Sequence, residues 1–318
     1  MRIHASLQAL PPAPEGRAIA IGAFDGVHLG HRAIIGRAVE RARAGGVPAT
    51  VLTFEPQPIA VLRPELKTVV LTPPERKAEL IAELGVDDLV IAPFTRAFSL
   101  IRWDRFAEML AKPPIDARWV VVGQNFHFGN RGRGNAALLA ERAQSLGFVV
   151  DVPPIVESPP GKPVSSTRVR RLVTQGEVAE AIPLLARPHS VDGTVVPGDQ
   201  RGRALGIPTA NLAVPPATAV PARGVYAGHA HVGGEVFAAA VNIGVAPTFT
   251  SGTGDPRVEV FLLDHADRDL YGERLRVCFI ERLRPERRFP SPEALVAQVH
   301  QDIERARVLA GSVGGALC

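Results

Sequence analysis

The fold is decided by the stretch from residue 17 to 54, RAIAIGAFDGVHLGHRAIIGRAVERARAGGVPATVLTF. Its two ends, RAIAIGAF (17–24) and ATVLTF (49–54), are apolar runs that are typical of strands buried on both faces. Between them, residues 30–44 carry apolar side chains three and four positions apart, which is the spacing of an amphipathic helix. A strand, a helix and a second strand in this order predict a βαβ unit with parallel strands.

The same alternation continues through the first half of the chain. It predicts a mainly parallel sheet, whose ligands bind beyond the carboxyl ends of the strands. Further strands are expected at 87–94, 118–124 and 147–153, and helices at 74–84, 104–111 and 135–146.

The pattern of the sequence changes after about residue 187. Short β-rich segments follow one another closely and are separated by Gly, Pro and Asp turns, which predicts a compact antiparallel barrel. One helix at 291–309 is expected to close this barrel, and residues 165–186 are expected to be helical and to lead into it. We therefore expect an α/β domain over residues 1–186 and a β-barrel domain over residues 187–318. The barrel segments are HSVDGTVV, GVYAGHAHV, VFAAAVNIG, RVEVFLLD and ERLRVCFIERL.

Composition limits the classes of function. The chain of 318 residues is 46% hydrophobic, so two domains with sizeable cores are expected. A net charge of +4 suits anionic ligands but does not by itself indicate a nucleic-acid surface. No signal-peptide core and no run of 18 apolar residues occurs. We therefore expect a soluble, cytoplasmic protein with no membrane partner.

The first candidate site follows the first strand. Gly22 and Gly26 allow a sharp turn there, and Gly30 removes a side chain where the next helix begins. The free N–H groups at a helix start attract phosphate. His28 and His31, three residues apart, lie on one side of the first turn and can donate hydrogen bonds to a phosphate. This arrangement suits a reaction at an α-phosphate, for which positioning and charge stabilisation suffice.

A simpler interpretation is that Asp25 shapes an ordinary turn and that both histidines are surface residues. A second cluster, VSSTRVRR (164–171), bears on this choice. Its hydroxyl and guanidinium groups can clamp phosphate oxygens, although a plain helix cap with solvated arginines has the same sequence. Both clusters in one α/β domain fit a nucleoside triphosphate that is held from two sides.

A third cluster is GRALGIPTANL (202–212). Gly202 and Gly206 permit close approach to phosphates, whereas Thr209 and Asn211 offer neutral oxygen ligands that suit Mg²⁺. A proline-containing turn at the rim of the barrel is the alternative.

Glu259 in RVEVFLLD (257–264) supports the functional interpretation of that third cluster. In a strand this glutamate is the one carboxylate among apolar side chains on both faces. Such a carboxylate is either paired, for example with an arginine, or used as a general base.

The chain resembles a known family in all of these blocks. GAFDGVHLGH, TFEPQP (53–58), VVGQNFHFG (121–129) and VSSTRVRR are similar to the adenylyltransferase half of prokaryotic bifunctional riboflavin kinase/FMN adenylyltransferases, or FAD synthetases. GRALGIPTANL and RVEVFLLD, together with GVYAG (224–228), VNIGVAPTF (241–249) and DLYGERL (269–275), resemble the riboflavin kinase module. The resemblance covers residues 17 to about 307 and implies a Rossmann-like nucleotidyltransferase domain followed by a riboflavin kinase barrel.

For the first domain, the resemblance implies that the phosphate of FMN attacks the α-phosphate of ATP. His28, His31 and Arg168 would be catalytic, and Asn125 would lie at the flavin end of the site. Three departures from the family pattern are Asn125 in place of Asp, Gln57 in place of His and Gly132 in place of Arg. The implied nucleotide-binding residues are Gly22, Phe24, Asp25, Gly30, Ser165, Ser166 and Thr167.

For the second domain, the resemblance implies that Thr209 and Asn211 bind Mg²⁺ with ATP, near Gly202 and Gly206. Glu259 would deprotonate the terminal hydroxyl of riboflavin for attack on the γ-phosphate. The expected partners are the small molecules ATP, riboflavin and FMN, without nucleic acid, and a homo-oligomer is left open. Two alternatives remain at this point: a kinase with an impaired first domain, and a non-catalytic flavin- or nucleotide-binding module.

Overall fold

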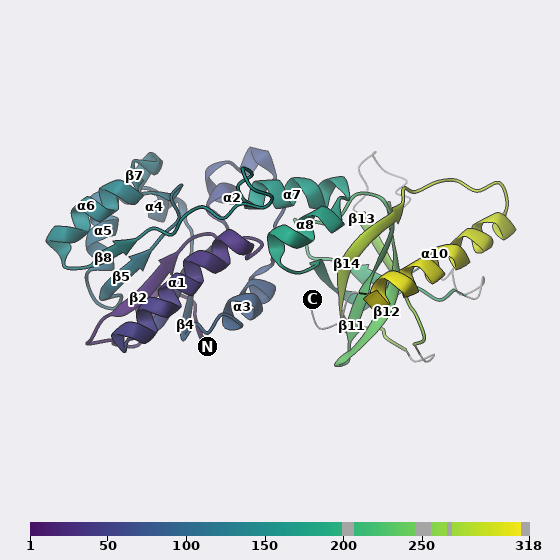
Figure 1. The fold of residues 1–318 in the computed structure, drawn as a ribbon, viewed down its shortest axis with the longest axis horizontal. Coiled ribbons are helices and arrows are strands. Elements are labelled where there is room, and N and C mark those ends of the chain that lie inside the picture. The colour runs from purple at the N-terminus through teal and green to yellow at the C-terminus, as the bar shows by residue number, and fades with distance from the viewer. Residues whose placement is uncertain (199–206, 246–255, 266–268, 313–318) are drawn as a thin grey trace. The chain divides into compact units, whose positions relative to one another are not determined.

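The computed structural model describes residues 1–198, 207–245, 256–265 and 269–312 (Figure 1). The chain forms two compact units. The first holds Met1–Thr68 and Thr72–Ser166, and the second holds Val69–Leu71 and the chain from Thr167 onward. These units are defined by packing alone. The expected division after residue 186 concerns which part of the chain carries which activity, and it stays a prediction.

A sheet of six parallel strands forms the centre of the first unit, in the order β1-β4-β3-β2-β5-β8. From β2 the chain builds outward to β3 and β4 on one side, and later to β5 and β8 on the other side. The order therefore reverses beside β2, and ligands of α/β sheets bind at such a reversal. The strands are β1 (Arg2–His4), β2 (Arg17–Ile21), β3 (Ala49–Glu55), β4 (Asp88–Pro93), β5 (Ala117–Val121) and β8 (Val149–Asp151).

Helices cover both faces of this sheet. The helices α1 (Leu29–Gly45) and α3 (Pro74–Ala82) pack on one face, and α5 (Trp103–Leu110) and α6 (Ala136–Leu146) pack on the other. The parallel strands are thus buried on both sides, which explains why their sequences are apolar throughout. Shorter elements are η1 (Leu7–Ala9), α2 (Pro58–Leu62), η2 (Pro64–Leu66), α4 (Arg96–Ser99), β6 (His127–Phe128), η3 (Asn130–Gly132) and β7 (Gly134–Asn135).

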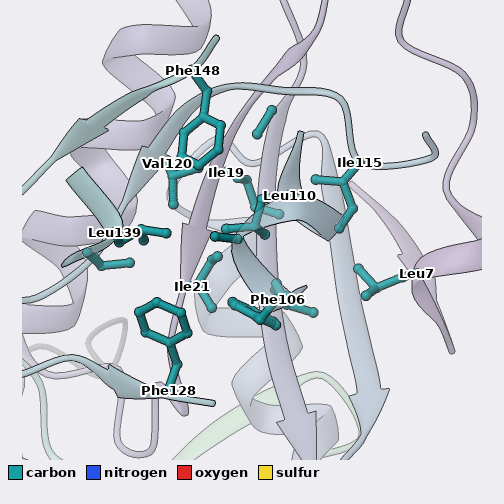
Figure 2. Packing of buried hydrophobic residues seen from close by; sticks show 14 of the residues in the cluster. Leu7, Ile19, Ile21, Phe106, Leu110, Ile115, Val120, Phe128, Leu139 and Phe148 are labelled. Carbon is teal, nitrogen blue, oxygen red and sulfur yellow. The ribbon is translucent and has the colours of Figure 1, made fainter. Parts of the chain in front are cut away.

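Alternation along β2 divides the core of the first unit into two layers. Ala20 packs with α1 and α3, whereas Ile19 and Ile21 pack with α5 and α6. Figure 2 shows the second layer, with the rings of Phe106 and Phe128 beside Ile21. These two rings lie 5.3 Å apart between centroids. The central strand that leads into the first candidate site is therefore fixed by rigid packing on both faces.

The second unit is a closed antiparallel barrel with the strand order β10-β13-β12-β11-β14-β9. Its interior holds Val258, Val260 and Leu262 of one strand, and the outer face of the barrel packs on the C-terminal helix α10. The elements are α7 (Ser166–Gln175), α8 (Val178–Leu185), β9 (His189–Val196), β10 (Ala210–Ala213), β11 (Gly224–Val232), β12 (Glu235–Val245), β13 (Pro256–Leu262), β14 (Arg274–Arg284) and α10 (Pro292–Ser312).

The predicted fold class is confirmed, with local differences. The first predicted strand ends at Ile21 rather than at residue 24, because Phe24 has a φ of 49°, which no strand residue adopts. β1 was not predicted, since three residues carry too short a pattern. β10 was not predicted either, because its sequence was interpreted as a ligand loop or turn. In the described residues, no helix is both long and apolar enough to cross a membrane.

Two candidate active sites

The loop between β2 and α1 contains the first candidate site. The strand order of the sheet reverses beside β2, directly before this loop. Three of its residues have left-handed backbone angles: Phe24 with φ 49°, Gly26 with φ 86° and Val27 with φ 40°. Aromatic and β-branched residues rarely adopt such angles, which cost about 1–3 kcal/mol each and persist only where neighbouring contacts hold them. The backbone is therefore strained immediately before His28.

Two threonines from other strands and loops hold this strained loop. The Thr72 N–H donates to Asp25 Oδ1 at 3.1 Å, and Thr72 Oγ1 accepts from the Gly26 N–H at 2.9 Å. The Thr53 hydroxyl donates to the Ala23 carbonyl oxygen at 3.0 Å. Asp25 is buried, and its bonds to Thr72 support the interpretation that its carboxylate shapes the turn.

Two glycines of the loop leave room for aromatic rings. A Cβ on Gly22 would lie 2.9 Å from Cε1 of Phe24, and a Cβ on Gly30 would lie 3.2 Å from Cε1 of His28. Phe24 is fully buried and packs with α1 and α3 on one face of the sheet. Both glycines thus serve the shape of the loop, whether or not they also approach a nucleotide.

His28 is the N-cap of α1 and is buried, with 5% of its surface exposed. Its Nδ1 accepts the N–H of His31 at 3.3 Å, so the proton of the neutral ring is on Nε2. The imidazoles of His28 and His31 are stacked, with centroids 3.6 Å apart and an angle of 18° between the planes. The two rings are therefore stacked at the positive end of the helix dipole, and both lie on one side of the first turn, as the spacing predicts.

The environment of His31 keeps its imidazole neutral. Burial lowers the pKa of His31 well below 6.5, and the nearby His28 and Lys77 lower it further. Its Nδ1 is buried and has no hydrogen-bond partner among the described residues, while Phe24 packs edge-on at 5.3 Å. A buried nitrogen without a partner is costly, and an incoming ligand could satisfy it.

Lys77 and Glu55 complete the charges around the histidine pair. Lys77 on α3 is 1% exposed, and its burial lowers its pKa although the charges of Asp25 and Glu55 raise it. The pKa of Glu55, at the end of β3, is raised mainly by burial, and the charge of Lys77 opposes this shift. The site thus contains a buried cation among carboxylates, a feature that the sequence analysis did not identify.

The second predicted phosphate cluster meets the loop through Ser166. The Ser166 hydroxyl donates to the carbonyl oxygen of Asp25 at 2.9 Å, across 141 positions of sequence. Ser165 immediately precedes α7, and both serines belong to the first unit. Thr167 is exposed and Arg168 is half-buried, and they continue the same helix in the second unit. The structure thus joins the serine part of the cluster to the histidine loop.

Two further predicted residues follow the ends of β3 and β5, the two strands that flank β2. Asn125 comes after β5 and is exposed, and a Cβ on Gly123 would lie 3.2 Å from its Oδ1. Gln57 comes after β3 and is 4% exposed, and its Nε2 has no partner among the described residues. Gln57 therefore offers a buried hydrogen-bond donor in place of the expected histidine.

The second candidate site is a row of polar side chains across three barrel strands. Glu259 on β13 lies directly opposite Asn211 on β10 and opposite Asn242 on β12. Asn242 Nδ2 donates to Glu259 Oε2 at 3.1 Å. The carboxylate is 27% exposed, which leaves it accessible to a substrate.

Arg257 is the arginine partner that sequence reasoning left open for Glu259. Its Nε lies 3.2 Å from Glu259 Oε1 and donates to Asn211 Oδ1 at 2.9 Å. The sequence carries a signal for this contact, because residues two apart on one strand point to the same face. The pair accounts for the glutamate structurally and also orients its carboxylate at the edge of the row.

The remaining predicted residues surround this row. Thr209 precedes β10 directly and is partly exposed, whereas Gly202 and Gly206 lie outside the described residues. A Cβ on Gly198 would collide with the side chain of Asn211, so a glycine there gives the asparagine its space.

A divalent cation would find neutral oxygen ligands here. The described residues contain no group of three His, Cys, Asp or Glu side chains suited to a metal. Mg²⁺ commonly takes one or two protein ligands and completes its shell with nucleotide phosphates and water. The hydroxyl of Thr209 and the amide oxygen of Asn211 are ligands of that type, and the Asn211 oxygen, which accepts one hydrogen bond from Arg257, keeps a second lone pair for a cation.

Comparisons with known proteins find a matching family model in each half of the chain. A family model described as FAD synthetase matches residues 10–168, and one described as riboflavin kinase matches residues 185–310. A curated relative from Listeria monocytogenes, named bifunctional riboflavin kinase/FMN adenylyltransferase, is 38% identical over 92% of this chain and 91% of its own length. A relative of the same name from Pseudomonas fluorescens is 37% identical over 98% of each chain. A solved structure from Streptococcus pneumoniae, titled a macrolide-efflux protein, has a TM-score of 0.85 and 30% identity, and covers 96% of this chain and 98% of that one.

Proposed function

The chain belongs to the bifunctional riboflavin kinase/FMN adenylyltransferase family, and from this premise we propose how its residues divide the two reactions. The enzyme phosphorylates riboflavin to FMN with ATP, and it adenylylates FMN to FAD with release of pyrophosphate. In our proposal residues 1–186 carry the adenylyl transfer and residues 187–318 carry the kinase reaction. This division is supported by the position of the histidine loop in the first compact unit and of Glu259 in the second, although Thr167 and Arg168 also belong to the second unit.

In the adenylyl transfer, an oxygen of the FMN phosphate attacks the α-phosphorus of ATP, and pyrophosphate leaves. The Nε2–H of His28 and the ring of His31 donate hydrogen bonds to the phosphate oxygens as charge grows, and Arg168 completes the charge stabilisation. The backbone from Gly22 to Gly30 receives the phosphates at the start of α1. Ser165, Ser166 and Thr167 bind the triphosphate from the start of α7, and Asn125 contacts the flavin end.

In the kinase reaction, Glu259 accepts the proton of the terminal ribityl hydroxyl, whose oxygen attacks the γ-phosphorus while ADP leaves. The bonds from Arg257 and Asn242 hold the carboxylate in one orientation for this transfer. Thr209 and Asn211 hold Mg²⁺ together with ATP, and Gly202 and Gly206 approach the nucleotide. The bound cation would neutralise charge on the phosphates during the transfer.

Further parts of the proposal concern partners and location. The substrates are small molecules, and we infer no nucleic-acid partner, since aromatic residues make up only 5% of the chain and offer few stacking platforms. A cytoplasmic location is supported by the consumption of ATP in both reactions.

A product assay tests the proposed function against its alternatives. The purified protein is incubated with riboflavin, ATP and Mg²⁺, and the flavins are separated by chromatography. We expect FAD to accumulate by way of FMN, because both clusters are present. FMN without FAD would indicate that Asn125, Gln57 or Gly132 disables the adenylyltransferase. Unchanged riboflavin would contradict the kinase assignment and support a binding module, and replacement of Mg²⁺ by a chelator should abolish both steps.

A further inference from the structure

Thr72, a residue to which no role is assigned, is one of the residues that hold the strained histidine loop. Thr72 lies two residues before α3, is 3% exposed and is far in sequence from the loop that it contacts. Its backbone N–H donates to Asp25 Oδ1, and its hydroxyl accepts from the Gly26 N–H at 2.9 Å. The same hydroxyl lies 3.4 Å from Asp25 Oδ1, to which it donates. One side chain thus bonds two consecutive residues of the loop.

The two residues that Thr72 bonds lie between the two residues with unfavourable backbone angles. Phe24 and Val27 flank the pair Asp25–Gly26, and both have positive φ values that their side chains oppose. Such angles persist only where surrounding contacts over-determine them. The Ser166 hydroxyl bonds the carbonyl oxygen of Asp25, and Thr72 binds both the Asp25 carboxylate and the Gly26 N–H.

His28 comes directly after Val27. The conformation of the loop therefore sets the position of His28 at the start of α1. Its Nδ1 must face the His31 N–H for Nε2 to carry the proton that is donated to phosphate. A relaxed loop would rotate His28 away from that geometry, and small misplacements of catalytic groups reduce rates strongly. We propose that Thr72 is a positioning residue of the adenylyl transfer, which acts through Asp25 and Gly26 to set His28. This inference rests on the proposed role of His28.

The decisive variants change only the hydroxyl. Thr72→Val keeps the shape of the side chain and removes both hydroxyl bonds, whereas Thr72→Ser keeps the hydroxyl. Thr50→Val is a matched control, because Thr50 is equally buried in the same unit but bonds Arg17 rather than the loop. The riboflavin kinase activity of each full-length variant controls for the integrity of the preparation.

We expect Thr72→Val to lower kcat of FAD formation about 100-fold, with a smaller change in KM, because His28 acts mainly as charge develops. Thr72→Ser and Thr50→Val should stay within a few-fold of the wild type, and kinase activity should be unchanged in all of them. Hydrogen exchange at the Gly26 amide should accelerate in Thr72→Val and not in Thr50→Val, because only the first loses its acceptor.

Three results would overturn the inference: wild-type kcat in Thr72→Val, equal losses in Thr72→Val and Thr72→Ser, or a loss confined to KM. If Thr72→Val fails to fold, Thr72→Cys replaces it, since a thiol of similar size is a weak hydrogen-bonding group. Cysteine must then lose activity while serine retains it, and equal activities would refute the role. His28→Ala is assayed in parallel. Retained FAD formation in His28→Ala would contradict the proposed function itself, independently of Thr72.

Discussion

At the scale of single residues, the first site is built from groups held in unusual states. His31 is kept neutral by burial, Lys77 is a buried ammonium, and the backbone of Val27 is strained. Perturbed protonation and strained backbone gather where a protein binds or transforms a ligand. The glycine and histidine spacing predicts a candidate site at this loop because both signals are local in sequence, and its function stays a prediction. Thr72 and Lys77 were missed because their contacts with the loop connect distant segments, and one sequence does not record them.

The charge of Lys77 gives a prediction about the titration of His31. Lys77→Met removes the charge and keeps most of the side-chain volume. The pKa of His31 should rise, because a positive neighbour that lowers it is lost, yet it should stay below 6.5, because burial is the larger cause. NMR titration of the labelled imidazole measures this directly. Lys67→Met, at an exposed lysine, should leave the titration unchanged. An unaltered titration in Lys77→Met would show that the two groups do not interact.

At the scale of elements, the apolar periodicity predicted most helices and strands of both units. It worked where a segment is long and buried, as in α1, β3 and β11. It failed for β1, where three residues show no period, and for β10, where Gly and Pro turn signals precede the strand. The stretch 165–186 was predicted helical, and the structure divides it into α7 and α8 at Gly176. That glycine is the local reason for the break.

Gly176 should be far more sensitive to substitution than a turn glycine of similar backbone angle. Its φ is +84°, and a Cβ would lie 2.7 Å from the hydroxyl oxygen of Tyr226. Tyr226 is fully buried and donates to the Ala222 carbonyl oxygen, and burial raises its pKa to about 12. Gly176→Ala should therefore cost about 1–2 kcal/mol for the backbone and about 1–3 kcal/mol more for overpacking.

Gly234→Ala is the matched control, because Gly234 has φ +82° and a Cβ there would meet nothing within 4 Å. Hydrogen exchange of the β11 amides measures the stability of the barrel in both variants. Both tryptophans, Trp103 and Trp119, lie in the first unit, so their fluorescence checks that this unit is unaffected. Equal destabilisation in the two variants would show that the Tyr226 contact imposes no cost.

At the scale of the whole molecule, two folds with different phosphate chemistry share one chain. A helix start at the reversal of a parallel sheet suits a reaction at an α-phosphate, and a carboxylate on a barrel strand suits activation of a hydroxyl. In our proposal, the product of the barrel reaction is the substrate of the other reaction. The sequence predicts this division through motif blocks that are each short, and the division stays a prediction. The contacts that orient their side chains, such as the hydrogen bond from Arg257 to Asn211 and the ion pair of Arg257 with Glu259, appear only in the structure.

The central claim is that each reaction has its own site, and a crossed assay of two variants tests it most directly. His28→Ala and Glu259→Gln are each supplied with ATP, Mg²⁺ and either riboflavin or FMN, and the flavin products are quantified. The account predicts that His28→Ala converts riboflavin to FMN and makes no FAD from either substrate. It predicts that Glu259→Gln leaves riboflavin unchanged and still converts FMN to FAD at the wild-type rate. Loss of both reactions in either folded variant, or retention of both, would contradict the account.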